Sequence, residues 1–587
     1  MIRRRSIPNS GVRIRESSLI AGVVAVIRER KVDLIFLALG VLLGTVVTWH
    51  FMLDDGLITL RYSRNLLDGY GPNWNHSGPR VEGYTSFLFM ISLAAAGLLK
   101  INLIVAAKVF GSLCLFAAAV VAYLVIGRRT GSRWASMVGG LAIAWSPAMW
   151  LHAGSTLETT AYGLVVVALV AVVMAASPKE MVALAPLSLA AALLRPEGIG
   201  VAILAHIAAV AFVDTDRRAV LTRFAGLVVL PFLGYVSWRW VYYGYPLPNT
   251  VYVKGGDTNL ASSARWFREN FVVWLPVGVG SAYCLKCGYF SRRVWAATTL
   301  PLLAMLPYGL SHLVTDFFHR FMSLCYPALV VSMVVVLVAL KSARERIVMM
   351  LATLVLAGYS APGATSTKNL VMVLAALLLL SACVWAYSVK PNVVMRRRWM
   401  RLPLAPVAIM AALILGWHAR GIEAHVVYAG RALDPVYGNF GRALSSGGPN
   451  LKVAVGDAGA IPYFSRAKVY DIAKLNDAPT THGANPRSVL DAFDPDVLML
   501  YSIDGVNPIV GQKGFLDITN LDTRYTKRGV LALWKTSFAN YGLVVYTKSS
   551  DLATTRLVDA ALQRGRWAHF CPVATWSCTL RRLVSGS

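Results

Sequence analysis

Long apolar segments joined by short polar loops are the feature of this sequence that most limits how it can fold. Of the 587 residues, 56% are hydrophobic and only 15% are charged, which is below the charged fraction of soluble proteins. A helix needs about 20 apolar residues to span a bilayer. Apolar segments near that length occupy residues 33–52, 102–126, 134–151, 160–176, 182–194, 198–213, 222–243, 271–290, 294–311, 323–340, 346–360, 368–388 and 403–419. The sequence therefore predicts a polytopic α-helical membrane protein with about 13 transmembrane helices.

The distribution of Lys and Arg indicates how these segments cross the membrane. The formal net charge is +28, and cytoplasmic loops of membrane proteins carry an excess of basic residues. With the N-terminus inside and each segment crossing once, the basic clusters all fall inside: Arg128/Arg129/Arg133, Lys179, Arg217/Arg218, Arg292/Arg293, Lys341/Arg344/Arg346 and Arg396–Arg398 with Arg401. Residues 182–213 must then cross twice, with a break at Arg195–Gly198. No basic, aromatic-rich soluble face is visible in the sequence, so we expect no nucleic-acid partner.

Charge and hydropathy divide the chain into three predicted parts. Residues 1–32 form a basic cytoplasmic N-terminus, residues 33–420 a transmembrane domain, and residues 421–587 a soluble extracytoplasmic domain. The outer loop 53–100 contains an apolar stretch that is too short to span and is expected to lie at the membrane interface. From Leu451 onward, short apolar runs alternate with turn residues, which predicts a small α/β domain. We expect a multi-pass protein of the plasma membrane.

Two adjacent carboxylates, Asp54 and Asp55, directly follow the first apolar segment. An acid at the mouth of a membrane helix is costly to place and usually serves chemistry or ion binding. A positioned carboxylate can take a proton from a hydroxyl group, and a pair of them can chelate a divalent cation such as Mg²⁺, Mn²⁺ or Ca²⁺. As an alternative, one Asp of the pair could cap the helix that follows it. We therefore expect a catalytic role for one of the two and leave open which one.

Several motifs carry a resemblance to a known enzyme family. The stretch DDGLITLRYSRNLLDGYGP, followed by RVEGYTS, resembles the first external loop of bacterial GT-C membrane glycosyltransferases. Further matches occur in the order that the family shows: STLET at 155–159, LLRPEG at 193–198, YYGYPLPNTVYVK at 242–254 and GDAGAIPYFS at 456–465. Within that family the chain is most similar to the actinobacterial terminal arabinofuranosyltransferases, which use decaprenyl-phosphoryl arabinose.

The resemblance implies an activity and a place for it. It implies transfer of arabinofuranose from a polyprenyl phosphate to a cell-envelope glycan such as arabinogalactan, on the outer face of the membrane, with Asp54 or Asp55 as the base. The arabinosyltransferases read RVEANTS where this chain reads RVEGYTS. Transfer of another sugar to a protein, lipid or envelope glycan is therefore an open alternative. A polytopic transporter is the alternative from another functional class.

The chemistry of a polyprenyl phosphosugar also requires cations near the membrane surface, because the departing phosphate gains negative charge. The outer loops offer Lys254, His319, Arg320 and Arg195 for this role. Basic residues at helix ends also reach toward lipid headgroups without any catalytic role, and that alternative applies to each of them.

Side chains within the matching motifs are candidates for binding the sugar or the acceptor. These are Glu82, Tyr84, Glu158, Arg61 and Arg64. For the two acids the alternative is an internal ion pair or a helix cap, for Tyr84 an interfacial aromatic belt, and for the two arginines a salt bridge with the Asp pair. We expect the C-terminal domain to position the acceptor and to take no part in the chemistry.

Overall fold

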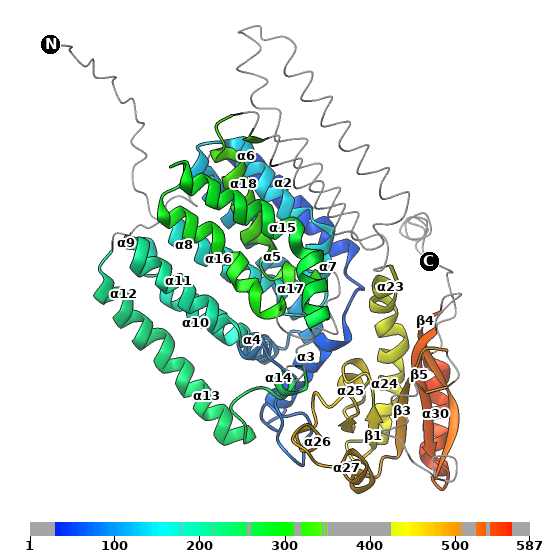
Figure 1. The fold of residues 1–587 in the computed structure, drawn as a ribbon. Helices are drawn as coiled ribbons and strands as arrows, with labels where there is room; N and C mark the ends of the chain where they lie inside the picture. The colour runs from blue at the N-terminus through cyan, green and yellow to red at the C-terminus, as the bar shows by residue number, and fades with distance from the viewer. Residues whose placement is uncertain are drawn as a thin grey trace, which may run out of the picture.

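The computed structural model describes residues 30–175, 178–213, 215–254, 260–309, 319–342, 345–346, 349, 424–504, 507–508, 524–535 and 540–565. Figure 1 shows a bundle of helices and, beside one end of it, a smaller unit of helices and strands. The predicted apolar segments 368–388 and 403–419, nearly all of 346–360, and most of the basic N-terminus lie outside the described residues.

The helices of the bundle follow the apolar segments of the sequence. They are α2 (Lys31–Val47), α5 (Leu103–Thr130), α6 (Arg133–Ala144), α7 (Pro147–Gly154), α8 (Thr159–Ala175), α9 (Pro178–Met181), α10 (Leu184–Leu194), α11 (Gly198–Phe212), α12 (Arg217–Phe224), η1 (Ala225–Val229), α13 (Leu230–Tyr243), α15 (Leu260–Lys286), α16 (Arg292–Gly309) and α18 (Tyr326–Ala339). Local signals set their ends. The Asn102 side chain accepts the N–H groups of Ile104 and Val105 where α5 begins, and Gly131 ends it with a left-handed backbone.

Four further helices lie in the connections that we assigned to the outer side. They are α3 (Asp54–Leu67), α4 (Phe87–Leu98), α14 (Asn249–Lys254) and α17 (Arg320–Ser323). The apolar helix α4 occupies the stretch 86–99 that we expected at the membrane interface.

Two helices of the described chain are long and apolar enough to cross a membrane by themselves: α5 and the continuous helix Arg217–Tyr243. A third span results if α7 and α8 count as one, because they pass the same test together but are bent by 120°. The number of 13 spans therefore stays a prediction. The predicted break within 182–213 is confirmed, since α10 ends at Leu194 and α11 begins at Gly198.

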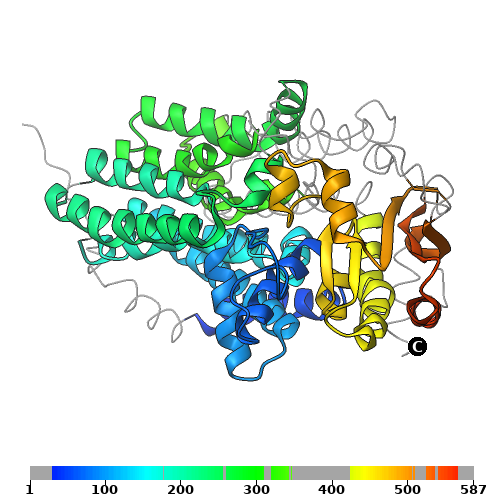
Figure 2. The same cartoon turned by 90° about the horizontal axis from the view of Figure 1, so that it is seen from below.

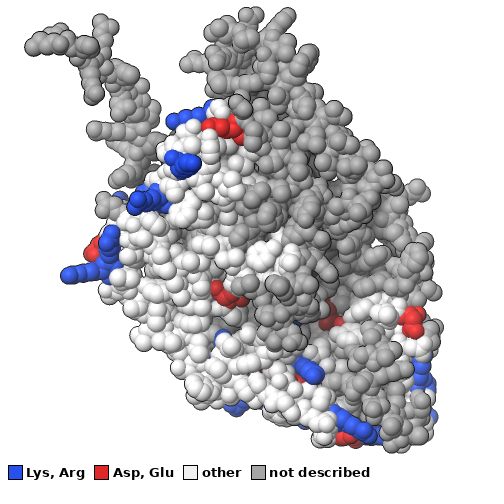
Figure 3. Space-filling model, viewed as in Figure 1, with Lys and Arg blue, Asp and Glu red and all other residues white. Residues whose placement is uncertain are grey.

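The charged side chains are distributed unevenly over the surface. Figure 3 shows Lys and Arg along the upper left edge, where α6, α9 and α12 lie in Figure 1, and a broad uncharged area below them. These helices follow or contain the basic clusters that we assigned to the cytoplasm, and the C-terminal unit lies at the opposite end. The arrangement agrees with the positive-inside rule, and the sidedness itself stays a prediction.

The C-terminal unit is built on a five-stranded sheet with the strand order β2-β1-β3-β5-β4. Its strands are β1 (Lys452–Val455), β2 (Lys468–Asp471), β3 (Val497–Ser502), β4 (Tyr525–Lys535) and β5 (Asn540–Lys548). Strand β1 pairs in parallel with β2 and β3, whereas β5 pairs antiparallel with β3 and β4. All five strands fall in the apolar runs from which we predicted an α/β region, and that prediction is confirmed.

Short helices surround this sheet and connect it to the bundle. They are α23 (Ala424–Leu433), η3 (Asp434–Gly438), α24 (Asn439–Leu444), η4 (Ser445–Gly447), α25 (Ala460–Ser465), α26 (Ala478–Thr481), α27 (Pro486–Phe493) and α30 (Leu552–Arg564). Figure 2 shows the unit beside the blue segment that contains α3. The outer loop 53–100 therefore contacts the C-terminal unit, whose sheet lies about 400 residues later in the chain.

Candidate active site

Arg61 and Arg64 of α3 fasten the outer loop to the C-terminal unit. Arg61 is fully buried, and it donates hydrogen bonds to the carbonyl oxygens of Trp74 (2.8 Å), Ala467 (2.8 Å) and Pro462. Arg64 donates to the carbonyl oxygen of Tyr463, and burial lowers its pKa to about 10. The donors of Arg61 are taken up by the backbone. Both arginines thus join α3 to the C-terminal unit, and their role in binding the sugar or the acceptor stays a prediction.

Asp54 also contacts the C-terminal unit. Its Oδ1 accepts the N–H of Ala460 and its Oδ2 accepts the N–H of Gly459, both at 2.7 Å. The N-cap residue of α3 is Leu53, and no side chain caps that helix end, so the expectation that Asp54 or Asp55 caps its own helix was wrong. Burial and the nearby charge of Asp457 raise the pKa of Asp54, against the opposite effect of the two N–H groups.

Asp55 is the more accessible member of the pair. Its side chain is 33% exposed, and its Oδ2 lies 3.8 Å from Nη1 of Arg320. Nη2 of Arg320 lies 3.2 Å from Oε1 of Glu158, and Nη1 of Arg195 binds the same oxygen. One buried carboxylate thus holds two guanidinium groups together, and one of these groups reaches Asp55. As an alternative, we considered a salt bridge between the Asp pair and Arg61 or Arg64. In the structure, Asp55 lies beside Arg320 instead.

The network continues to Glu197, which belongs to the LLRPEG motif. Its Oε1 accepts hydrogen bonds from Nε of Arg195 and from the hydroxyl group of Tyr308. Tyr308 lies on α16, more than 100 residues later in the chain, so no local pattern could have linked it to the LLRPEG motif.

Breaks in the helices bring these charged groups together. Glu158 lies between α7 and α8, Arg195 lies between α10 and α11, and Arg320 begins α17. Non-helical backbone at membrane depth is tolerated where it is buried in protein or lines a cavity. Thr156 and His319, which precede two of the charged residues, have left-handed backbones with φ of 65° and 48°. Such conformations are rare outside glycine and gather at functional sites.

Arg320 retains unused binding capacity. Its Nε atom is buried and has no hydrogen-bond partner within the described part of the chain. A buried guanidinium N–H without a partner is costly, and an anion entering the site would satisfy it.

Glu82 and Tyr84 lie in a different environment from this network. Oε2 of Glu82 is 2.9 Å from Nε of Arg239, and the Tyr235 hydroxyl donates to Oε1 over 3.1 Å. Burial raises the pKa of Glu82 to about 7. Tyr84 is buried, with its hydroxyl 3.3 Å from that of Tyr243. The partners of both residues belong to α13, so the structure shows them packing the outer loop against that helix rather than lining the Asp55 site.

The two remaining phosphate candidates differ in position. His319 immediately precedes Arg320, and burial lowers its pKa. Lys254 ends α14, whose Asn249 donates to the carbonyl oxygens of Lys474 and Leu475 in the C-terminal unit. Among the residues that the structure describes, no ion pair joins Lys254 to Asp55 or Glu158. The structure therefore joins Arg195 and Arg320 through Glu158, with His319 next to Arg320 in the chain, and a phosphate-binding role of Lys254 stays a prediction.

A third carboxylate, Asp457, approaches the Asp pair from the C-terminal unit. Its Oδ2 accepts the hydroxyl of Tyr437 (3.0 Å) and its Oδ1 accepts that of Tyr541 (2.8 Å). Burial raises the pKa of Asp457 to about 6, and the charge of Asp55 contributes. We expected the C-terminal domain to take no part in the chemistry, and that expectation stays untested; the structure shows that a carboxylate of this unit lies near enough to affect the Asp pair electrostatically.

A divalent cation at the Asp pair would need oxygen ligands with free lone pairs pointing to one centre. In the described ranges, no group of three or more His, Cys, Asp or Glu side chains is arranged to hold a metal ion. Both oxygens of Asp54 face N–H donors. The divalent cation that we considered at the Asp pair stays a prediction, and we derive no step through it.

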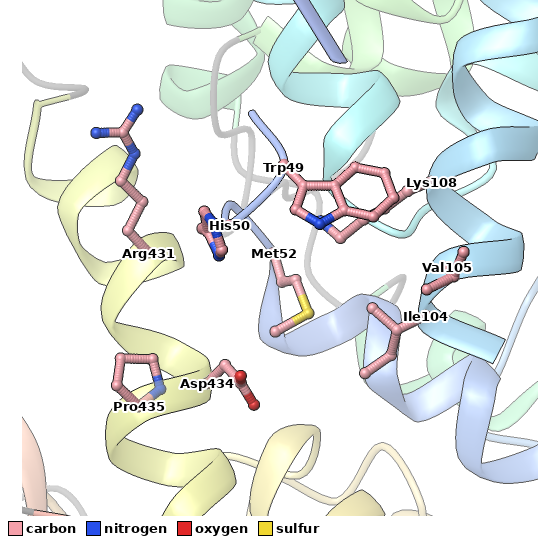
Figure 4. Close-up of a pocket in the computed structure, with 9 residues that line it drawn as sticks. All are labelled: Trp49, His50, Met52, Ile104, Val105, Lys108, Arg431, Asp434 and Pro435. Atoms are coloured by element: carbon pink, nitrogen blue, oxygen red, sulfur yellow. The ribbon is translucent and has the colours of Figure 1, made fainter. Parts of the chain in front are cut away.

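A cavity of about 280 Å³ lies between the end of α2, the start of α5 and the C-terminal unit, and Figure 4 shows its lining. It is lined by Trp49, His50, Met52, Ile104, Val105, Lys108, Arg431, Asp434 and Pro435. Buried Lys108 donates to the carbonyl oxygens of Phe51 (2.5 Å) and Gly154 (2.9 Å). It thus ties together the chain segments that lead to Asp54 and to Glu158. Sequence reasoning missed Lys108, although a lone lysine in the apolar segment 102–126 is a recognisable signal.

Comparisons with known proteins bear on the fold. A family described as a domain of unknown function (DUF8728) matches residues 428–556, within the C-terminal unit. No curated protein matches the chain. Two similar solved structures are those of ArnT from Cupriavidus metallidurans, one bound to undecaprenyl phosphate and one in the apo state.

The likeness to ArnT extends over nearly the whole length of both chains. The complex is 14% identical with a TM-score of 0.55 and covers 88% of this chain and 98% of ArnT. For the apo structure the identity is 15%, the TM-score 0.52, and the coverage 90% and 98%. This chain therefore shares the fold of ArnT, with a helical bundle and a C-terminal α/β region.

Proposed function

We propose that this chain is a membrane glycosyltransferase that takes a sugar from a polyprenyl phosphate and transfers it to a cell-envelope glycan on the outer face of the membrane. The observation that carries the proposal is the position of the partly exposed Asp55 beside the Arg320–Glu158–Arg195 network. A base and two cations next to one another are what such a transfer requires. One of the similar ArnT structures is bound to undecaprenyl phosphate, a lipid of the class that would carry the sugar here.

In the proposed reaction, an oxygen of the acceptor attacks the anomeric carbon of the donor sugar. Asp55 takes the proton of the attacking hydroxyl as the new C–O bond forms, and the bond from the anomeric carbon to the phosphate oxygen breaks with its electron pair going to the phosphate. The growing charge is met by the guanidinium groups of Arg320 and Arg195, and the Nε–H of Arg320 has no hydrogen-bond partner among the described residues. Glu158 acts by holding both cations in place.

For the sugar we propose arabinofuranose carried on decaprenyl phosphate, on the strength of the motif resemblance. Transfer of another sugar is the alternative, since RVEGYTS departs from the arabinosyltransferase pattern at two positions. The proposal places the enzyme as a multi-pass protein of the plasma membrane, with Asp55 and the C-terminal unit facing outward.

A direct assay tests the activity. We expect the purified protein to transfer label from decaprenyl-phosphoryl arabinose to an arabinan acceptor, and to do so faster than from other polyprenyl phosphosugars offered separately. Faster transfer from another donor would correct the sugar but keep the enzyme class. If folded protein transferred label from none of the donors, the glycosyltransferase proposal would be wrong, and uptake of labelled solutes into proteoliposomes would then test the transporter alternative.

A second prediction concerns the phosphate site. We expect Arg320→Ala to raise the KM for the polyprenyl donor by about 10–100-fold and to change the KM for the acceptor little, because only the donor carries phosphate. The size follows from about 1.5–3 kcal/mol for a hydrogen bond to a charged group. Arg524→Ala is the matched control, since Arg524 is an exposed arginine that pairs with Asp491 and Asp494 on the C-terminal unit. Equal changes in both KM values would mean that Arg320 has a general structural role.

A further inference from the structure

The C-terminal unit reaches the proposed catalytic pair through the backbone of one loop, Gly456–Ala460. The N–H groups of Gly459 and Ala460 hold both oxygens of the Asp54 carboxylate at 2.7 Å. A side chain at position 459 has no room, because its Cβ would overlap the carbonyl oxygen of Asp54 and lie 2.5 Å from Cγ. The approach of this loop therefore requires glycine at that position and fixes Asp54 where it stands.

The same loop is itself held in one conformation. The hydroxyl group of Tyr501 on β3 donates to the carbonyl oxygen of Gly456 at 2.6 Å. Tyr437 of η3 and Tyr541 of β5 each donate to one oxygen of Asp457. The carboxylate of Asp457 is thus oriented from two separate elements. The two tyrosine hydroxyl groups carry no charge, so they orient the carboxylate and leave its negative charge in place.

Three carboxylates consequently share one neighbourhood. Asp54 and Asp55 come from α3 and Asp457 from the loop after β1, whereas the facing groups of η3, β3 and β5 are uncharged tyrosines. Arg320 is the cation that reaches the pair, at 3.8 Å from Asp55. Like charges disfavour one another's ionisation, so the charge on Asp457 affects the protonation of its neighbours. The raised pKa of Asp54 has the charge of Asp457 among its causes, after burial.

We propose that the loop Gly456–Ala460 is part of the catalytic centre, where Gly459 and Ala460 position the Asp54–Asp55 pair and Asp457 adds a negative charge near Asp54. The inference rests on the proposed function, in which Asp55 is the base. None of the three loop residues is proposed to touch the substrate, and each acts through the pair. It follows that the C-terminal unit contributes to the rate of transfer itself, for acceptors of any length.

Gly459→Ala tests the positioning. We expect it to lower kcat at least tenfold and to leave the KM for the donor nearly unchanged, since Arg320 and Arg195 stay in place. Gly200→Ala is the control, because a Cβ at Gly200 in α11 would meet nothing within 4 Å. A rise in donor KM with unchanged kcat would contradict the inference.

Asp457→Asn tests the electrostatic part and does not depend on the first variant folding. Asparagine can keep both tyrosine partners, since its oxygen accepts and its amide donates, but it removes the negative charge. A like charge raises the pKa of a carboxyl group, so its removal should let Asp54 ionise at lower pH. Asp54 accepts both N–H groups of Gly459 and Ala460 fully only when it is ionised, and in that state it holds Asp55 in place. We therefore expect the acid limb of the kcat/KM profile to move to lower pH. A merely structural role would lower activity at every pH without moving the limb.

The controls separate this inference from the proposed function. Asp491→Asn changes an exposed carboxylate of the same unit and should leave the limb where it is in the wild-type enzyme. If Asp55→Asn is inactive while Gly459→Ala keeps the wild-type kcat and Asp457→Asn keeps the wild-type limb, the inference is wrong and the proposed function stands. If Asp55→Asn keeps wild-type turnover, Asp55 is not the base, and the inference falls with that assignment, whereas the transfer assay still decides the enzyme class.

Discussion

We expect the Asp55→Asn enzyme to fold and insert normally but to transfer sugar about 10²–10⁴ times more slowly than the wild-type enzyme. Asparagine keeps the shape of the side chain but cannot accept the proton of the attacking hydroxyl. The loss should appear in kcat, because Arg320 and Arg195 remain to bind the donor phosphate. Single-turnover transfer from a saturating labelled donor measures it.

Two companion variants show whether the effect belongs to Asp55. Asp68→Asn changes an exposed acid at the end of the same helix and should have wild-type turnover. Asp54→Asn places an amide N–H₂ against one of the N–H groups of Gly459 and Ala460, so we expect a lower unfolding temperature together with a partial loss of activity. Wild-type turnover of Asp55→Asn, with an inactive Asp54→Asn, would identify Asp54 as the base and contradict our assignment.

The sequence was sufficient to predict the parts of the fold that depend on local pattern. Apolar periodicity located the helices of the bundle, and the charged interruption at Arg195–Gly198 located the break between α10 and α11. Alternation of short apolar runs after Leu451 predicted the α/β region in which the five strands lie. These features are encoded within about 20 residues of chain, so a single sequence is enough to read them.

The roles of the charged residues could be predicted only in part, because their partners are distant in sequence. Arg61 follows the Asp pair at helical spacing, which favoured a local salt bridge, but its acceptors are carbonyl oxygens about 400 residues later. Glu82 was a candidate for sugar binding from its motif, but in the structure it pairs with Arg239. In each case a buried charge found a partner that only the fold brings near.

The charged residues of the proposed site also come from segments that are far apart in the sequence. Glu158 lies in the STLET motif and Arg195 in the LLRPEG motif, but nothing in the sequence says that Glu158 joins Arg195 to Arg320. A helix break allows a polar side chain at membrane depth, and three such breaks meeting at one place make a site. Which breaks meet is a property of helix packing and not of the motifs.

Arg61 gives the last test, because the sequence and the structure assign it different roles. If Arg61 fastens α3 to the C-terminal unit, Arg61→Ala leaves the buried carbonyl oxygens of Pro462 and Ala467 without donors, at about 1–3 kcal/mol each. We expect a loss of about 3 kcal/mol or more in stability, seen as a lower unfolding temperature and faster proteolysis of the C-terminal unit. Transfer to short and long acceptors should fall together, since the junction also holds Asp54.

The matched control is Arg442→Ala. Arg442 is an arginine of the C-terminal unit whose side chain is 44% exposed and pairs with Asp434 on the surface, and such pairs contribute about 1 kcal/mol or less. If Arg61→Ala instead keeps the wild-type unfolding temperature and raises only the KM for the acceptor, Arg61 binds the sugar as its motif suggested. In that case the contacts to Pro462 and Ala467 do not hold the two parts of the protein together, and the dependence of the catalytic pair on the C-terminal unit would have to rest on Gly459 and Ala460 alone.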